Sequence, residues 1–269
     1  MQAPDPRREP IFNLPAVVTA SVAVLVILHA IRSVLLSPAA DFGLLLDWAV
    51  VPARWTAAWD PSRAEAIVRE AAGGFSGREA GVREALAQYI LADGGAKPWT
   101  ALTYALLHGS WAHVLLNGVW LAAFGTPVAR RCGPVRFLTL GALCAAGGAF
   151  AHALADPLSS VPMVGASAAI SGWMAAAARF VFAPDRGPLY GTGAVREAQA
   201  QAHLRPRQTI GELLRNRGAA MFLVMWFASN LLFGLAAAPL GITESAVAWE
   251  AHIGGFLAGL LLFPWLDRQ

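Results

Sequence analysis

The sequence predicts an all-α polytopic membrane protein, because its composition, its apolar runs and its pattern of basic residues all fit that class. Of the 269 residues, 57% are hydrophobic and 14% are charged, and the mean hydropathy is +0.51. A soluble globular protein has about 45–50% apolar and about 25% charged residues. The apolar excess lies in runs close to the roughly 20 residues with which a helix crosses the hydrocarbon core.

Six such runs predict six membrane-spanning helices. They cover Ile11–Leu36, Trp111–Val128, Phe137–Leu154, Gly165–Phe182, Ala219–Ala238 and Ala246–Leu266. A membrane domain over residues 11–266 is therefore expected, with a tail at 1–10 and another at 267–269. Acidic residues in the first tail and the length of the run after it argue against a cleavable signal peptide.

Two long polar segments separate these spans. The first, residues 37–98, forms a long loop, and the charge and alanine spacing of Ala64–Leu91 predicts that part of this range forms a surface helix. The second covers residues 184–217 and carries arginines at positions 186, 196, 205, 207, 215 and 217. Tryptophans in the first loop fit an interfacial aromatic belt.

Basic residues set the expected orientation. Arg130, Arg131 and Arg136 and the arginines of 184–217 would face the cytoplasm if both termini are cytoplasmic, whereas the short loops on the opposite side lack Lys and Arg. The pattern fits a bacterial inner membrane. It also explains the net charge of +3 and the pI near 9.3 without a nucleic-acid partner.

The two cysteines predict neither a metal site nor a disulfide framework. Cys132 and Cys144 are twelve residues apart, without the spacing of metal ligands, and we expect both to pack as small side chains. No His-Glu-x-x-His motif is present, which disfavours a metalloprotease.

Ser167 and His252 stand in small-residue segments of two apolar spans. A polar, ionisable side chain inside a membrane span indicates a functional site by default. Gly255 and Gly259 share the helical face of His252, and Ser171 continues the face of Ser167, so the two helices can approach closely. Small residues of this kind also serve tight packing alone, which remains the alternative for each segment taken separately.

A serine at a helix start lies beside free backbone N–H groups that can stabilise an oxyanion. His252 could take the hydroxyl proton and return it to a leaving amine. We expect a dyad, since Glu250 faces another side of its helix.

A third polar cluster opens the second span. His113 and Asn117 are four residues apart, so both project from one helical face, and their N–H groups are suitable oxyanion donors. Two buried polar residues that bond to nearby backbone would give the same pattern.

Together these segments resemble the rhomboid family of intramembrane serine proteases over roughly Trp99 to Leu266. The matching motifs are His113 with Asn117, Gly165-Ala166-Ser167, and Ala251-His252 with Gly255 and Gly259. The segment Val51-Pro52-Ala53-Arg54 in the first loop also looks like the family's.

The resemblance implies a six-helix bundle with Ser167 as nucleophile, His252 as general base, and His113, Asn117 and the Gly165–Ser167 backbone as oxyanion hole. It further implies a mobile fifth span as substrate gate, a first loop partly in the outer leaflet, single-span membrane proteins as substrates, and no metal or other cofactor.

The sequence departs from the family pattern at three positions. Ala168 follows the nucleophile where many members have glycine, and Ser171 stands where many have an aromatic ring on the catalytic histidine. The first-loop Trp-Arg pair is Trp99-Thr100 here. Two other functions remain open: a catalytically inactive relative that binds transmembrane clients, and a small transporter that uses the histidines as a proton path.

Overall fold

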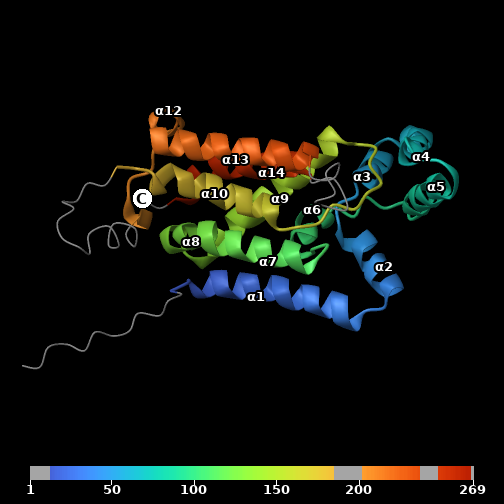
Figure 1. Cartoon of the computed structure of the whole chain (residues 1–269), viewed down its shortest axis with the longest axis horizontal. Coiled ribbons are helices and arrows are strands. Elements are labelled where there is room, and N and C mark those ends of the chain that lie inside the picture. Colours follow the sequence, from blue (N-terminus) through green and yellow to red (C-terminus); the bar gives the residue numbers. More distant parts are fainter. Residues whose placement is uncertain (1–12, 185–201, 237–247, 268–269) are drawn as a thin grey trace, which may run out of the picture.

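Long helices lie side by side along the longest axis of the molecule (Figure 1). The computed structural model describes residues 13–184, 202–236 and 248–267. The long helices are α1 (Ala16–Ala30, continued by the π-turn Ile31–Leu35), α7 (Trp111–Trp120), α9 (Pro134–Ala155), α10 (Ser167–Val181), α13 (Arg217–Ala236) and α14 (Trp249–Leu266). Among the described residues the only β-pairing is an isolated bridge between Val50 and Met163. The predicted all-α class is confirmed.

Three of the predicted spans have the length and hydropathy to cross a membrane: Ala16–Leu35, Trp111–Cys132 and Pro134–Ala155. The second combines α7, the π-turn Leu121–Gly125 and α8 (Thr126–Cys132) in one rod. A shorter apolar helix covers Arg217–Leu232. The chain is thus an integral membrane protein, and helices fall within all six predicted runs, although residues 11, 12, 237, 238, 246 and 247 lie outside the described part.

The first loop folds into several short helices. They are α2 (Pro38–Trp48), α3 (Pro52–Trp59), α4 (Ala64–Ala72) and α5 (Gly77–Ala92), and α6 (Thr100–Thr103) follows the loop. Helix is found within Ala64–Leu91, as expected, and it is divided between α4 and α5, where Gly74 and Gly77 have φ of +79° and +59°. Such conformations favour glycine and end a helix. The loop helices share a small core at one end of the bundle (Figure 1).

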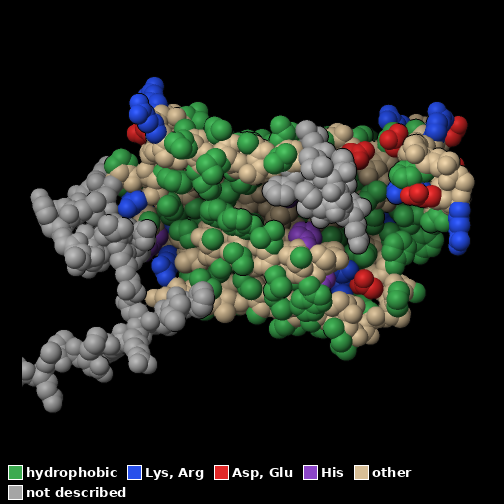
Figure 2. All heavy atoms as spheres, viewed as in Figure 1, with side chains coloured by type: hydrophobic (Ala, Val, Ile, Leu, Met, Phe, Trp, Pro, Cys, Tyr) green, Lys and Arg blue, Asp and Glu red, His purple; other side chains and the backbone are tan. Residues whose placement is uncertain are grey.

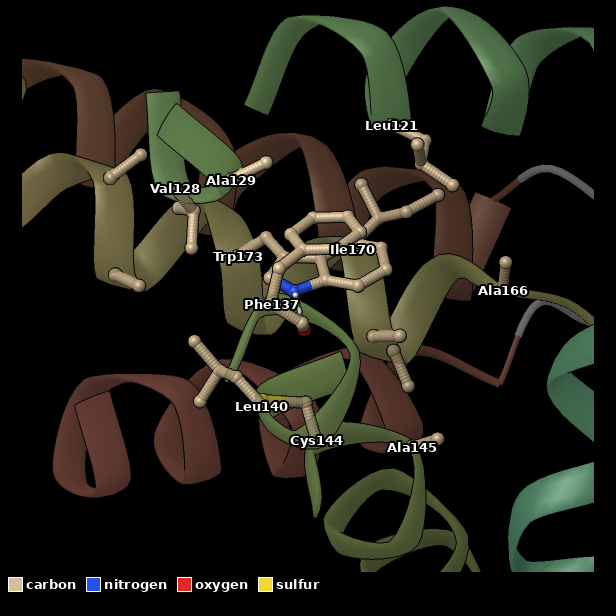
Figure 3. Close-up of a cluster of buried hydrophobic side chains, with 14 of the residues drawn as sticks. Leu121, Val128, Ala129, Phe137, Leu140, Cys144, Ala145, Ala166, Ile170 and Trp173 are labelled. Carbon is tan, nitrogen blue, oxygen red and sulfur yellow. Dashed lines mark hydrogen bonds between the residues drawn. The ribbon is translucent and has the colours of Figure 1, made fainter. Parts of the chain in front are cut away.

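α10 lies at the centre of the bundle. Every residue from Ala168 to Phe180 is buried, because small side chains let α9 and α14 approach from two sides. The Trp173 ring stacks on Phe137 of α9 with centroids 4.2 Å apart, and its Nε1 donates to the Phe137 carbonyl over 3.0 Å (Figure 3). A Cβ on Gly172 would lie 2.1 Å from the Cys144 sulfur. Both cysteines are buried and free, as expected of packing residues.

The surface has an apolar middle between two charged ends. On the face in Figure 2, hydrophobic side chains cover most of the long helices, and charged side chains gather near α4 and α5 and near α12 (Ile210–Arg215). A hydrocarbon layer around the middle would leave these charges in water. This distribution favours a membrane normal along the long axis of the bundle.

A buried ion pair closes the end of the bundle opposite the loop helices. Arg131 donates to both carboxylate oxygens of Asp267 over 2.8 and 2.9 Å, and both side chains are fully buried. The same guanidinium donates to the carbonyls of His203 and Arg205. These bonds tie the described part of the segment 184–217 to α8 and to the end of α14.

Candidate active site

A turn at Gly165 leads into α10, whose first residue is Ser167. Gly165 has a φ of +128°, and its N–H donates to the Tyr104 carbonyl over 3.0 Å. A Cβ at Gly165 would lie 2.9 Å from the His113 ring and 3.7 Å from the Ser167 hydroxyl oxygen. Only glycine fits this conformation and this space. The turn therefore brings Ser167 and His113 to one place.

Ser167 and His252 form a direct hydrogen bond between two helices. The Nε2 atom of His252 lies 2.8 Å from the Ser167 Oγ, and both side chains are partly buried. Neutral imidazole accepts at one ring nitrogen, so the hydroxyl can donate its proton to Nε2. The two side chains that the sequence pairs are thus in contact.

The glycines after His252 permit this contact. A Cβ at Gly255 would lie 2.1 Å from the Ala168 carbonyl oxygen, and one at Gly259 would lie 2.2 Å from the Gly172 carbonyl oxygen. Both distances are far below contact, so α14 and α10 meet backbone to backbone. The helix-packing role predicted for these glycines agrees with this geometry.

His113 and Asn117 lie on α7 beside the turn. The Ser110 hydroxyl accepts from the His113 N–H over 3.2 Å and caps the helix. Asn117 is 5% exposed, and its Nδ2 has no hydrogen-bond partner in the described residues. A buried amide donor without a partner is costly, and this one remains available to an acceptor.

Ser171, at the position where many rhomboids have an aromatic ring, does not contact the His252 ring through such a group. Its hydroxyl donates to the Ser167 carbonyl, one turn back, over 2.8 Å. In the part of the chain that the structure describes, no aromatic ring pairs with His252. Ser171 therefore adds to the first turn of α10 and leaves the histidine ring to other partners.

Asn230 of α13 also belongs to the site, although the sequence did not predict it. Its Oδ1 lies 2.6 Å from the Nδ1 of His252. The sequence carries a signal for it, since Ser229-Asn230 is a polar pair within an apolar run, where an amide needs a partner. Its partner could not be read from the chain, because 22 positions separate the two residues.

Glu250 turns away from the dyad, as its place on the helix predicts. Its Oε2 lies 3.8 Å from the Nδ1 of His152 on α9.

Thr100 stands where many rhomboids have arginine. The Thr100 hydroxyl accepts from Trp55 over 3.2 Å and donates to the Lys97 carbonyl over 2.7 Å. Lys97 itself pairs with Asp47 and Asp93. The cation at this part of the loop is therefore Lys97, three residues before Thr100.

Comparison with known proteins agrees with the motifs. The sequence profile of the Rhomboid domain matches residues 95–268, which hold Ser167, His252, His113, Asn117 and Asn230. A search of curated proteins returned no match to the chain. The match begins after α5, so most of the first-loop helices precede it.

Proposed function

Because the chain belongs to the rhomboid family, we propose that it is an intramembrane serine endopeptidase. The observation that carries the proposal is the 2.8 Å contact between the Ser167 Oγ and the His252 Nε2. A hydroxyl with an adjacent general base is the arrangement that activates a serine nucleophile. Fold alone would not support an activity, whereas this pair of side chains does.

In the proposed reaction, the Ser167 Oγ attacks the substrate carbonyl carbon while His252 Nε2 takes the hydroxyl proton. The carbonyl oxygen becomes an oxyanion, which His113, the Asn117 amide and the Gly165–Ser167 backbone stabilise. The C–N bond then breaks, and His252 returns the proton to the leaving amine. Water, deprotonated by His252, hydrolyses the acyl-enzyme and releases a carboxylic acid and free Ser167.

The length of α10 supports a site below the membrane surface. Its 15 residues span about 22 Å, whereas the 22 residues of neighbouring α9 span about 33 Å. Ser167, at the start of the shorter helix, would then lie inside the outer interface. Single-span membrane proteins whose helix unwinds near that interface are the substrates that we propose.

The proposal includes the arrangement in the membrane. Six spans would place both termini on the cytoplasmic side, with the loop helices outside, in a bacterial inner membrane. The end of the bundle with α8 and α12 would face the cytoplasm, in line with the arginines there. Residues 1–10, 11–266 and 267–269 would be the tail, membrane domain and second tail.

Proteolysis by reconstituted protein tests the function. Wild type, Ser167→Ala and His252→Ala are compared on a single-span substrate with a small-residue, helix-destabilising cleavage region. Cleavage by wild type alone is the expected result. Equal cleavage by all three would overturn the proposal, and no cleavage together with client binding by all three would favour an inactive, client-binding relative.

A further inference from the structure

In the described residues of α13 and α14, a hydrogen bond between two polar side chains lies within an otherwise apolar contact. Residues 226, 230 and 234 lie on one face of α13. Residue 226 contacts residue 256 of α14, residue 230 contacts residue 252, and residue 234 contacts residue 249. The Trp226 ring stacks on Phe256 with centroids 4.7 Å apart, and a Cβ at Gly234 would lie 2.6 Å from the Trp249 ring. Between these two apolar contacts, Asn230 bonds to His252.

The orientation of the Asn230 amide follows from its other bond. Its Nδ2 donates to the Trp226 carbonyl over 3.3 Å, one turn back on α13. The Oδ1 therefore faces His252 and can only accept. The bond at 2.6 Å then requires a proton on His252 Nδ1, which leaves the Nε2 lone pair toward the Ser167 hydroxyl.

The rest of the described site does not provide a second partner for Nδ1. Glu250 faces His152, and Ser171 bonds to the Ser167 carbonyl. The nearby ring of Phe256 stacks on Trp226 and pairs with Phe227, both on α13. The orientation of the histidine therefore depends on α13.

α13 itself is held mainly from one side. Large apolar side chains on its other faces are exposed: Met221, Val224, Met225, Leu231 and Leu232. The first half of α13, which follows α12, packs into a small cluster in which Leu213, Ala219 and Leu223 are buried. The second half of α13, which contains Asn230, contacts α14 along one face. It can separate from α14 without opening the core between α9, α10 and α14.

We infer that Asn230 is a positioning residue that fixes the His252 tautomer, and that it makes the dyad competent only while α13 is docked on α14. The inference rests on the proposed function for its consequence in catalysis. With α13 displaced, Nδ1 has no acceptor, the ring can carry its proton on Nε2, and Ser167 loses its base. A substrate that wedges α13 away would be cleaved only after the helix returns.

Three variants of Asn230 and its neighbours test the positioning role in the full-length protein. Asn230→Leu keeps the size and removes the acceptor, Asn230→Asp keeps an acceptor oxygen, and Ser229→Ala is the control, since Ser229 is exposed and bonds to the Met225 carbonyl. Asn230→Leu should lower both kcat and the rate of fluorophosphonate labelling by roughly 100-fold with KM nearly unchanged, because a wrong histidine tautomer can cost about 10⁴-fold. Asn230→Asp should retain most of the labelling rate.

The tautomer gives a readout independent of activity. Nitrogen-15 NMR of histidine-labelled protein, with His252→Gln to assign the signal, should show Nδ1–H in wild type and a tautomer mixture in Asn230→Leu. Trp226→Leu, which loosens the contact between α13 and α14 but keeps Asn230, should move the signal the same way. An unchanged tautomer in Asn230→Leu would overturn the positioning role, and an unchanged tautomer in Trp226→Leu would overturn the dependence on docking. A wild type with the Nδ1–H signal but no cleavage would instead count against the proposed function.

Discussion

Gly255 of α14 lies directly against the carbonyl oxygen of Ala168, the residue after Ser167 in α10. A Cβ at Gly255 would approach that oxygen to 2.1 Å. The obstacle is backbone rather than a flexible side chain, so it cannot move aside. The distance between the two helices, and with it the bond between Ser167 and His252, therefore depends on the absence of a side chain at Gly255, as it does at Gly259.

Gly255→Ala should push α14 away from α10 and abolish proteolysis and fluorophosphonate labelling. We expect a loss of stability of about 2 kcal/mol or more from overpacking, seen as a lower Tm in detergent. Gly43→Ala is the matched control, because nothing lies within 4 Å of its added Cβ on α2. Normal labelling by Gly255→Ala would contradict the close-approach account.

Arg32 links α1 to the loop that precedes α7. Its guanidinium donates to the His108 carbonyl over 3.0 Å and to Asp41 over 2.7 and 3.2 Å, while 7% exposed. Arg32→Gln should cost about 2 kcal/mol, the scale of a hydrogen bond to a charged group. It should also lower kcat, because His108 packs on His113 with ring centroids 5.0 Å apart. Arg69→Gln, in an exposed pair, should leave both values at the wild-type level.

The ion pairs that Arg54 and Lys97 form with Asp93 predict a stability that depends on pH in the acid range. The pKa of Asp93 lies below its ordinary 3.8, first because Lys97 and then because Arg54 donates to the carboxylate. A lowered pKa in the folded state stabilises the protein above pH 3.8, and this stabilisation is lost as the pH falls through the folded value. Asp93→Asn should lower Tm at neutral pH and flatten its decline below about pH 4. Parallel Tm profiles for variant and wild type would argue against this pairing.

The ion pair at the opposite end predicts a larger effect. The side chains of Arg131 and Asp267 are fully buried, so removal of one partner leaves a buried charge. Asp267→Asn should lower the free energy of unfolding by about 3 kcal/mol, measured by thermal unfolding in detergent. Glu65→Gln, in an exposed pair on α4, serves as control. A Tm equal to wild type for Asp267→Asn would show that the buried pair contributes nothing net.

Helix positions and the pairing of Ser167 with His252 could be predicted because local sequence patterns indicate both. Apolar runs predict helices in a membrane protein, and small residues at spacing of three and four predict close approach. The exact ends of α4 and α5 were not predicted, because charged and alanine residues occur on both sides of the glycines at 73, 74 and 77 that separate the two helices. Asn230 was missed because its partner comes from the packing of two helices, which no local pattern specifies.

The site of covalent labelling tests the central claim most directly. The purified protein is treated with a fluorophosphonate, and the modified residue is located by mass spectrometry of its peptides. A serine activated by His252 at 2.8 Å predicts an adduct on Ser167 in wild type, none in Ser167→Ala and a strongly reduced yield in His252→Ala. An adduct on another serine, or equal labelling of wild type and His252→Ala, would contradict the proposed dyad.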